Sequence, residues 1–146
     1  MRNTLEKQTL ETPRLILRQW RESDVAPFAE MNADRKVMQY FPETLSHEES
    51  THLVERYQQH FDEYGFGLWA VEVKDQAEFV GFIGLAVPQF TAYFTPCVEI
   101  CWRLAAPYWN QGIATEGAQA TLDFGFNHCN LKEVVGFTVP ANVASR

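Results

Sequence analysis

Two apolar segments joined by a short polar link constrain the fold of this chain most strongly. The segments are "FGLWAVEV" (66–73) and "EFVGFIGLAV" (78–87), and the link between them is "KDQA". Both segments are rich in β-branched and aromatic residues, and a link of this length and polarity is typical of an antiparallel hairpin. We therefore expect two adjacent antiparallel strands in the middle of a sheet.

The residues before the hairpin predict a strand and then a helix. The run "RLILRQW" (14–20) is apolar and β-prone, and it predicts the first strand. The segment "SDVAPFAEMN" (23–32) opens with Ser23 and Asp24 as candidate caps and predicts the first helix. A short second helical piece is expected near residues 34 to 40.

The next predicted helix has the most complete set of sequence signals. Ser46 and Glu49 have the spacing of a capping box, and Gly65 ends the pattern. Between them, large apolar residues recur at about the helical period: Leu53, Tyr57, Phe61 and Tyr64. We therefore expect a helix that begins after Ser46 and ends before Gly65.

Three further elements follow the hairpin. The segment "CVEICWRL" (97–104) predicts a fourth strand, "GIATEGAQATLDFGF" (112–126) a third helix and "EVVGFTV" (133–139) a fifth strand. The third helix carries a stripe of mostly small residues three or four positions apart, which would let its axis approach a sheet closely: Ala114, Ala118, Leu122 and Gly125. The expected order is βααβββαβ, an α/β (α+β) fold with a mixed sheet.

Composition and charge exclude several classes of protein. The chain has 146 residues, of which 46% are hydrophobic and 14% aromatic, and this indicates one globular domain rather than disorder. No apolar run approaches the roughly 20 residues of a membrane span, and the N-terminal segment lacks the apolar core of a signal peptide. A formal net charge of -7 disfavours nucleic acid and leaves amine-bearing partners open. We therefore expect a cytoplasmic protein that binds neither membrane nor nucleic acid.

The cysteines and histidines do not form a metal-binding pattern. The cysteines lack CxxC spacing, although the first two would share one face of a strand: Cys97, Cys101 and Cys129. The three histidines near the second predicted helix are not spaced as the i, i+4 pair of a helical zinc site: His47, His52 and His60. We expect no metal site and individually packed, reduced thiols, with a metal pair at the first two cysteines as the alternative.

An unusual helix start follows the fourth strand, in "PYWNQGIATEGA" (107–118). The helix opens on Gly112-Ile113-Ala114 rather than on a Ser or Asp cap. The first amides of a helix have no internal partner and carry a partial positive charge, so an anion can replace the missing cap. Gly112 has no Cβ to block a ligand oxygen, and the amides of residues 110 to 114 could converge on it. The expected anion is a phosphate, and the alternative is a plain turn.

Four segments together carry a resemblance to a known family: "TPRLILRQWRESD", "YGFGLWAVEV", "FVGFIGL" and "VEICWRLAAPYWNQGIATEGAQATLDFGF". In these segments, and in the order of its elements, the chain resembles the GNAT superfamily of acetyl-CoA-dependent N-acetyltransferases. Within it, the chain resembles the RimJ/RimL-like branch of ribosomal-protein N-terminal acetyltransferases. The resemblance extends from about Leu10 to Arg146. It implies a GNAT-type, mainly antiparallel twisted sheet that splays between the fourth and fifth strands.

The resemblance also implies that acetyl-CoA lies where these two strands splay, with its pyrophosphate on the loop before the third helix. The family's pattern Gln/Arg-x-x-Gly-x-Gly/Ala matches residues 109–114, except that Trp109 stands in place of Gln or Arg. The backbone of residues 100–104 would run beside the pantetheine arm, and Asn142 matches an Asn that commonly bonds the cofactor. The implied cofactor-binding residues are Ile100, Cys101, Trp102, Arg103, Leu104, Trp109, Asn110, Gln111, Gly112, Ile113, Ala114, Thr115 and Asn142.

Glu99 is the candidate general base. It is the one carboxylate within the fourth strand, and the alternation of a strand puts it on the face of Cys101 and Arg103. Acetyl transfer needs an unprotonated amine, and a carboxylate beside the acetyl group could take the amine proton, directly or through water. The alternative is a structural ion pair with Arg103 or with a cross-strand partner. An acyl-cysteine intermediate is not expected, because no His is placed in sequence as an activating base.

These residues lead to an expected function and to one alternative. We expect an acetyl-CoA-dependent N-acetyltransferase that transfers an acetyl group, by direct attack in a ternary complex, to a protein N-terminus, an amino sugar or a polyamine. The alternative is a non-catalytic CoA-binding or interaction module. Family members normally continue beyond the segment that ends at Arg146, so residues 1–146 are expected to form a single, C-terminally incomplete GNAT domain. The fifth strand, 133–139, would then be an apolar sheet edge, which predicts a homodimer.

Overall fold

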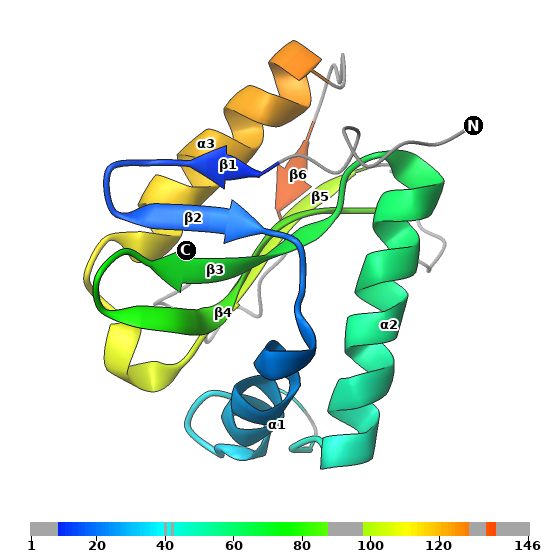
Figure 1. Cartoon of the computed structure of the whole chain (residues 1–146), viewed down its shortest axis with the longest axis vertical. Helices are drawn as coiled ribbons and strands as arrows, with labels where there is room; N and C mark the ends of the chain where they lie inside the picture. The colour runs from blue at the N-terminus through cyan, green and yellow to red at the C-terminus, as the bar shows by residue number, and fades with distance from the viewer. Residues whose placement is uncertain (1–8, 40, 42, 88–97, 129–133, 137–146) are drawn as a thin grey trace.

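Six strands form one sheet in the computed structural model, which describes residues 9–39, 41, 43–87, 98–128 and 134–136. The strands lie side by side in the order in which they occur along the chain (Figure 1). Neighbours are antiparallel, except for the last two, which are parallel. The sheet is therefore mixed and mainly antiparallel, as predicted. Its strands are β1 (Leu10–Glu11), β2 (Leu15–Arg18), β3 (Leu68–Val73), β4 (Ala77–Ala86), β5 (Glu99–Leu104) and β6 (Val135–Gly136).

The predicted hairpin lies in the centre of this sheet. β3 and β4 are joined by a turn over residues 74 to 76, in which Asp75 has a positive φ of 62°. Ala70 pairs with Phe82 across the hairpin, and a register shift lies between Val71 and Val73. β2 pairs with the outer side of β3, and β5 pairs with the outer side of β4. Both hairpin strands are thus interior strands of the sheet.

One short strand is absent from the sequence prediction. β1 has 2 residues and pairs with β2 through a turn in which the Thr12 amide donates to the Leu15 carbonyl at 2.9 Å. A strand this short shows no visible alternation of apolar and polar residues. The predicted first strand is therefore β2, and the described elements follow the order ββααβββαβ.

The helices match the prediction except at one point. The described residues form α1 (Val25–Ala33), α2 (His47–Tyr64) and α3 (Ile113–His128), with single 3-10 turns η2 (Glu22–Asp24) and η3 (Ala106–Tyr108). The short helical piece predicted near residues 34 to 40 is wrong, because residues 35 to 39 form turns. The Asp34 carboxylate accepts the Lys36 amide at 2.9 Å, and the Asp34 carbonyl accepts the Met38 amide at 3.0 Å. The bond from the Lys36 amide to the Asp34 carboxylate is a local turn that competes with a helix, whereas the bond from the Met38 amide closes a single helical turn that does not continue.

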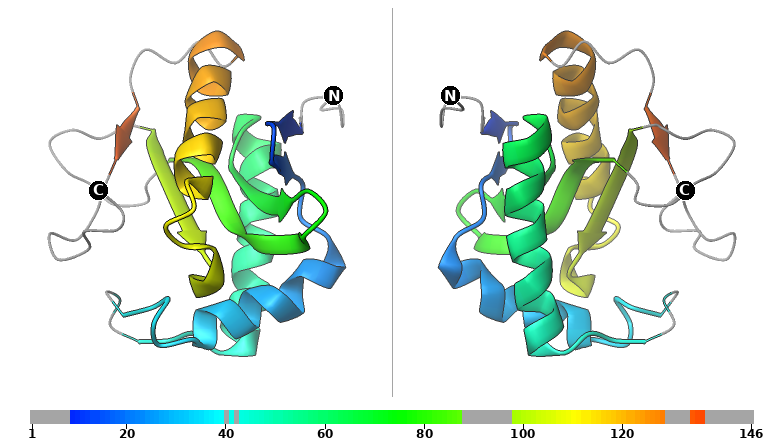
Figure 2. Two further views of the ribbon diagram at one scale, coloured as in Figure 1. Left: turned by 90° about the vertical axis from the view of Figure 1, so that its left-hand side faces the viewer. Right: turned by 90° about the vertical axis from the view of Figure 1, so that its right-hand side faces the viewer.

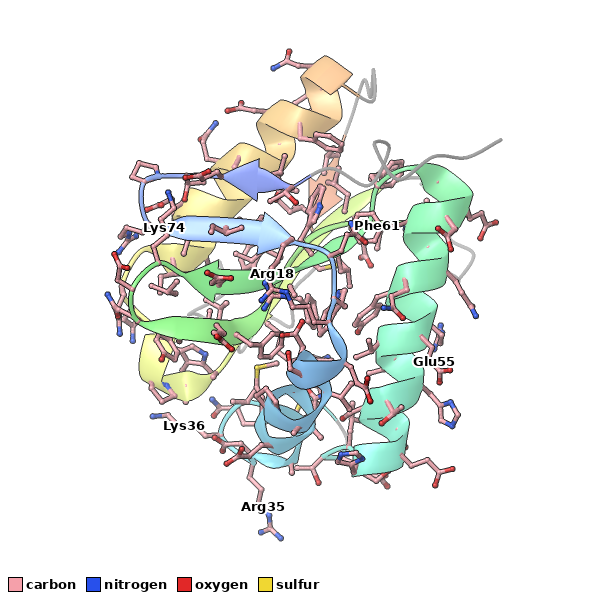
Figure 3. The ribbon with its side chains drawn as sticks, in the orientation of Figure 1. Arg18, Arg35, Lys36, Glu55, Phe61 and Lys74 are labelled. Carbon is pink, nitrogen blue, oxygen red and sulfur yellow. The ribbon has the colours of Figure 1, made fainter. Side chains whose placement is uncertain are left out.

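α2 begins and ends where its sequence signals place it. The Ser46 hydroxyl accepts the Glu49 amide at 3.1 Å, and the Glu49 carboxylate accepts the Ser46 amide at 2.8 Å. Gly65 follows the helix with a φ of 78°, a left-handed conformation that favours glycine. Phe61 points from α2 toward the sheet, whereas Glu55 points away from it (Figure 3). The capping box and the C-terminal glycine therefore fix the bounds of α2, and its buried residues, Phe61 among them, fix which face meets the sheet.

The helices cover both faces of the sheet. α1 and α2 lie over one face, and α3 lies over the other (Figure 2). The buried apolar residues form two clusters accordingly. The cluster on the α1/α2 face includes Trp20, Phe28, Met31, Val54, Leu68, Ala70 and Phe82. The cluster on the α3 face includes Leu15, Leu17, Trp69, Val71, Ile83, Leu85, Leu104, Ile113 and Phe124, together with Phe61 of α2.

α3 approaches the sheet closely, and Gly117 is the reason. A Cβ atom at Gly117 would lie 2.3 Å from Cδ1 of Ile83, which is inside the contact distance of two carbon atoms. The buried Thr121 hydroxyl finds its hydrogen-bond acceptor within the same helix, because it donates to the Gly117 carbonyl at 2.8 Å. The predicted close approach is confirmed, although Gly117 makes it and the predicted Ala114 and Ala118 are only partly buried. The start of α3 is thereby held next to β4 and β5.

A buried ion pair joins β2 to the helical layer. Arg18 is 5% exposed and points from β2 toward the start of α1 (Figure 3). Its two terminal nitrogens donate to the two carboxylate oxygens of Asp24 at 2.8 and 2.9 Å, and its Nε donates to Glu72 at 3.2 Å. Asp24, which is 1% exposed, also accepts the Arg21 amide at 2.8 Å. One guanidinium therefore links β2, β3 and η2.

His60 connects α2 to the ends of β3 and β4. Its Nε2 accepts the Val87 amide at 3.0 Å, and its Nδ1 lies 2.8 Å from the Phe66 carbonyl. An amide can only donate, so Nε2 carries no proton and the Nδ1–H donates to Phe66. Burial lowers the pKa of His60, although its neighbours Phe66 and Glu63 oppose that shift. The folded state therefore holds a neutral imidazole.

The lowered pKa of His60 predicts that acid weakens the fold. A group whose folded pKa lies below its unfolded value stabilises the protein above the unfolded pKa of about 6.5, and this contribution is lost as the pH falls through the folded pKa. We expect the midpoint of thermal unfolding to fall between pH 7 and pH 5, and to fall less steeply in His60→Gln. The control is His52→Gln, an exposed position on the same helix, which should keep the wild-type slope. Equal slopes in all three proteins would contradict the assignment.

Candidate functional site

The loop between β5 and α3 presents a row of unpaired backbone amides. Asn110 and Gly112 have positive φ angles of 61° and 78°, and α3 begins at Ile113. The Glu116 amide donates to the Gly112 carbonyl at 3.0 Å, which closes the first turn of the helix. Within the described part of the chain, the amides of residues 110 to 115 donate to no protein acceptor. The sequence prediction of an uncapped, amide-rich helix start is therefore confirmed.

Residues from the β1–β2 turn hold this loop in place. Arg14 donates from Nη1 to the Gln111 carbonyl at 2.8 Å and from Nε to the Glu116 carboxylate at 2.7 Å. Glu116 also accepts the Arg14 amide at 2.9 Å and the Thr12 hydroxyl at 2.5 Å. Burial opposes ionisation of Glu116, but these hydrogen bonds outweigh it and lower its pKa. The clamp uses the Gln111 carbonyl and the Glu116 carboxylate and takes up none of the loop's amides.

Sequence reasoning did not find this clamp. Arg14 and Glu116 are separated by 102 positions, so no local pattern connects them. The only available signal was Glu116 in the first turn of α3, where a carboxylate is favoured by the helix dipole. Its structural role is shown by its bonds to Thr12 and Arg14.

Trp109 anchors the loop from within the protein. Its indole N–H donates to the Leu104 carbonyl at 2.7 Å, and its ring packs against both core clusters. The Lys36 ammonium lies 5.6 Å from the centre of the indole. Trp109 thus stands where the family pattern has Gln or Arg, and it contributes packing rather than a charge. The cation beside the loop is instead Arg14, whose Nη2 would lie 3.3 Å from a Cβ at Gly112.

β5 pairs with its two neighbours over different lengths. It pairs with β4 from Glu99 to Leu104, but its described pairs with β6 are only Glu99 with Val135 and Ile100 with Gly136. β5 and β6 are the fourth and fifth predicted strands, and their described pairing ends after Ile100. Asn142 and the other residues after Gly136 lie outside the described residues.

The side chains of β5 alternate between the two faces as predicted. Ile100, Trp102 and Leu104 contact the cluster on the α3 face. Cys101 contacts the cluster on the α1/α2 face, and Arg103 lies over Phe82 of that same cluster. Glu99 therefore shares its face of β5 with Cys101 and Arg103.

Glu99 is a partly buried carboxylate at the start of β5, and burial raises its pKa. Among the described residues, none forms an ion pair or hydrogen bond with its side chain. Its neighbours on the adjacent strands are Ala86 and Val135, neither of which is basic. Arg103 donates to Asn32 instead. The alternative structural ion pair is therefore not formed with any described residue.

The remaining polar candidates do not form a second reactive centre. Burial raises the pKa of Cys101 to about 12, so its thiol stays protonated at neutral pH and is a poor nucleophile. Cys97 and Cys129 lie outside the described residues. The described residues contain no group of three or more His, Cys, Asp or Glu that could hold a metal ion. None of the helices in the described ranges is long and apolar enough to cross a membrane.

Comparison with known families identifies the fold that these features belong to. The model of the acetyltransferase (GNAT) domain matches residues 14–146. The chain belongs to the GNAT acetyltransferase family. GNAT domains are acyltransferases, and the matched range contains both β5 and the amide loop.

Individual relatives agree with this assignment. The Bacillus subtilis protein YkkB is 34% identical over 95% of this chain and 80% of its own length. The Bacillus subtilis N-acetyltransferase YnaD is 30% identical over 93% of this chain and 76% of its own length. A solved acetyltransferase from Agrobacterium tumefaciens is 26% identical, with a TM-score of 0.80 over 94% of this chain and 78% of its own. These similarities support an N-acetyltransferase.

Solved structures of ribosomal-protein acetyltransferases share the fold as well. RimJ from Mycobacterium smegmatis, solved in complex with CoA-disulfide, has a TM-score of 0.70 over 96% of this chain and 72% of its own. Its sequence identity of 20% shows a common fold alone. The RimJ/RimL-like branch is therefore one of several structural neighbours of this GNAT domain.

Proposed function

We propose that the chain is an acetyl-CoA-dependent N-acetyltransferase of the RimJ/RimL-like branch, acting on an amine such as a protein N-terminus, an amino sugar or a polyamine. The observation that carries the proposal is the row of unpaired amides at residues 110 to 115, at the start of a helix in a GNAT domain. Helix starts of this kind bind phosphate groups through backbone amides and the helix dipole. Acetyl-CoA is the acetyl donor of GNAT enzymes, and it carries a pyrophosphate.

The residues of the loop fit such a group. Asn110 and Gly112 turn the backbone through positive φ angles, a geometry in which successive amides can face one side. Arg14 bonds the Gln111 carbonyl and keeps that peptide group oriented. A Cβ at Gly112 would contact only the end of the Arg14 side chain, so no other described group packs against the loop at this position. The proposed pyrophosphate-binding residues are Trp109, Asn110, Gln111, Gly112, Ile113, Ala114 and Thr115, most of them through main-chain amides.

β5 is the proposed binding edge for the pantetheine arm. Its described pairing with β6 ends after Ile100, so the backbone edge from Cys101 to Leu104 has no β6 partner among the described residues. An extended arm with amide groups can pair with such an edge as an added strand does. The proposed contacts are the main-chain groups of Ile100, Cys101, Trp102, Arg103 and Leu104, with Asn142 as a further contact.

Glu99 is the proposed general base. The bound donor supplies the thioester acetyl group, and the acceptor must lose a proton to attack it. Burial raises the pKa of Glu99, which brings this carboxylate closer to the range in which a base exchanges protons near neutral pH. Because no described residue pairs with its side chain, the carboxylate is available to an amine or to a bridging water.

A thiol-release assay tests the proposed function. Acetyl-CoA is incubated with the protein and a panel of amines that includes N-terminal peptides, amino sugars and polyamines, and free CoA is measured. Amine-dependent thiol release would support the enzyme. Binding of acetyl-CoA without release for any amine would support the alternative, a non-catalytic CoA-binding module, and absence of binding would contradict both.

Localisation and assembly are part of the same proposal. We propose a cytoplasmic protein that forms a homodimer through the sheet edge at β6, the last strand of the described sheet. Light scattering across a range of concentrations measures the assembly, and a monomer at tens of micromolar would contradict the dimer.

A further inference from the structure

The guanidinium of Arg103 is a cation without a described acidic partner. It extends from β5 on the same face as Glu99, and its Nη1 donates to Oδ1 of Asn32 at 2.8 Å. No carboxylate of the described residues pairs with it. Burial lowers the pKa of Arg103, which shows that its surroundings hydrate the charge poorly. A guanidinium has five N–H donors, so most of its donors are left for another group.

The surroundings hold this cation in a fixed place. Asn32 is fully buried on α1, and its amide nitrogen donates to the hydroxyl of Ser50 on α2 at 3.0 Å. The guanidinium carbon lies 4.9 Å from the ring centre of Phe41 and 5.2 Å from that of Phe82. Cation–π contacts of this kind compensate only part of the cost of removing a charge from water. The fold therefore orients a planar cation without neutralising it.

The other titratable groups around Arg103 are neutral. Burial raises the pKa of Tyr57 to about 12, and that of Cys101 also to about 12, so neither supplies a negative charge near pH 7. Glu99 is not among the charges that shift the pKa of Arg103, so it does not act as a close counter-ion. The negative charge that would complete this site is not provided by the described residues.

The site is also close to the surface. Phe41, in the connection between α1 and α2, is one of the exposed large apolar residues of the described chain, with 47% of its surface accessible. It covers the guanidinium on one side, and the buried Phe82 covers it on another. Arg103 itself is only partly buried as a residue, so we place the approach of a small anionic group beside Phe41. A carboxylate matches the planar fork of a guanidinium with two parallel hydrogen bonds.

We propose that Arg103 binds a carboxylate of the acceptor, so that the preferred acceptor is a molecule with both an amine and a carboxylate. This inference rests on the proposed function and narrows its substrate class. Glu99 and Arg103 lie on one face of β5, about 13 Å apart at the usual rise of a strand. An acceptor with its amine near Glu99 and its carboxylate at Arg103 has several bonds between the two groups. Peptides with an acidic side chain and longer ω-amino acids fit this description, whereas short amino acids, polyamines and neutral amino sugars do not.

Matched pairs of acceptors test the proposal. Each pair consists of a carboxylate and its carboxamide: an ω-amino acid and its amide, a dipeptide and its C-terminal amide, and a peptide with Asp or Glu second in the chain and its Asn or Gln counterpart. In the wild type, kcat/KM should be about 10- to 100-fold higher for the carboxylate of at least one pair, because a hydrogen bond to a charged group is worth about 1.5–3 kcal/mol. The pair with the largest ratio identifies the source of the carboxylate.

Three variants separate recognition from packing. Arg103→Gln should reduce the ratio of kcat/KM for the carboxylate to kcat/KM for its amide to about 1. Arg103→Lys should retain part of the preference for the carboxylate, because lysine keeps the positive charge but lacks the two parallel N–H donors of a guanidinium. Asn32→Asp, which is nearly isosteric, gives Arg103 an internal carboxylate and should abolish the preference while Arg103 stays in place. A purely structural Arg103 would alter stability in these variants without changing the ratio of carboxylate to amide.

The outcomes distinguish this inference from the proposed function. Turnover with equal rates for both members of every wild-type pair, or a preference that persists in Arg103→Gln, would overturn the inference and leave the acetyltransferase intact. Absence of thiol release with any amine would overturn the function. In that case, binding of the same pairs measured by NMR decides the inference: tighter binding of a carboxylate that is lost in Arg103→Gln supports it, and equal binding overturns it. If Arg103→Gln does not fold, the ratio of carboxylate to amide is measured in Arg103→Lys and Asn32→Asp instead.

Discussion

Asp24→Ala should lower the free energy of unfolding by about 3 to 5 kcal/mol, because it leaves the buried guanidinium of Arg18 without its main counter-charge. Both partners are almost completely buried, and they share two hydrogen bonds of 2.8 and 2.9 Å. The variant also removes the acceptor of the Arg21 amide at the start of η2. Such a loss is a large part of the roughly 5–15 kcal/mol that stabilises a typical domain. Urea unfolding followed by circular dichroism measures it.

An exposed ion pair on the same sheet supplies the matched control. Lys74 and Glu11 form a contact between β1 and the β3–β4 turn, and Glu11 is 67% exposed. Exposed pairs of this kind contribute about 0–1 kcal/mol, so Glu11→Ala should change the free energy of unfolding by no more than that. Equal losses in Asp24→Ala and Glu11→Ala would show that the buried pair does not join the layers as described.

Glu99→Gln should lower turnover about 100-fold or more at neutral pH. The carboxamide has nearly the same shape but cannot accept the amine proton as a base. In the wild type, the rate should fall as acid protonates Glu99, at a pH above its ordinary range because burial raises its pKa. In the variant this acid limb should disappear, and the deficit should shrink at high pH, where the amine is already neutral. The measurement is kcat/KM against pH for both proteins.

The control for this variant is another carboxylate on the same sheet. Glu78 is exposed on β4, and Glu78→Gln should retain wild-type turnover and the wild-type pH profile. A Glu99→Gln enzyme with an unaltered profile would assign Glu99 to a structural role, and the base would have to be sought elsewhere.

Elements with local signals could be predicted from the sequence. The capping box of Ser46 and Glu49 and the left-handed Gly65 are neighbours along the chain, and both bounds of α2 follow from them. The hairpin of β3 and β4 could be predicted equally well, because its turn is short. The piece predicted near residues 34 to 40 is wrong because the Asp34 carboxylate accepts the Lys36 amide and only turns form after it, which a hydrophobic pattern does not reveal.

In the candidate site, too, the features with local sequence signals could be predicted and the others could not. The uncapped start of α3 is visible in the residues 110 to 114 themselves, and the alternation of β5 correctly groups Glu99, Cys101 and Arg103. The clamp by Arg14 and the environment of Arg103 were not predictable, because each joins residues far apart in sequence. The Arg103–Asn32 bond spans 71 positions and depends on how α1 packs on the sheet. The role of Glu99 as a base stays a prediction.

Calorimetric titration of acetyl-CoA into the wild type and Gly112→Val tests the central claim most directly. Valine would bring a Cβ against the Arg14 guanidinium and would strain the left-handed backbone at this position, so the loop would lose the geometry in which its amides are proposed to meet the pyrophosphate. The expected loss is about 1–3 kcal/mol of binding free energy, or roughly 5- to 150-fold in Kd. Gly65→Val is the matched control, since Gly65 has the same φ of 78° at the distant end of α2, and it should bind as the wild type does. A folded Gly112→Val protein with wild-type affinity would contradict the account.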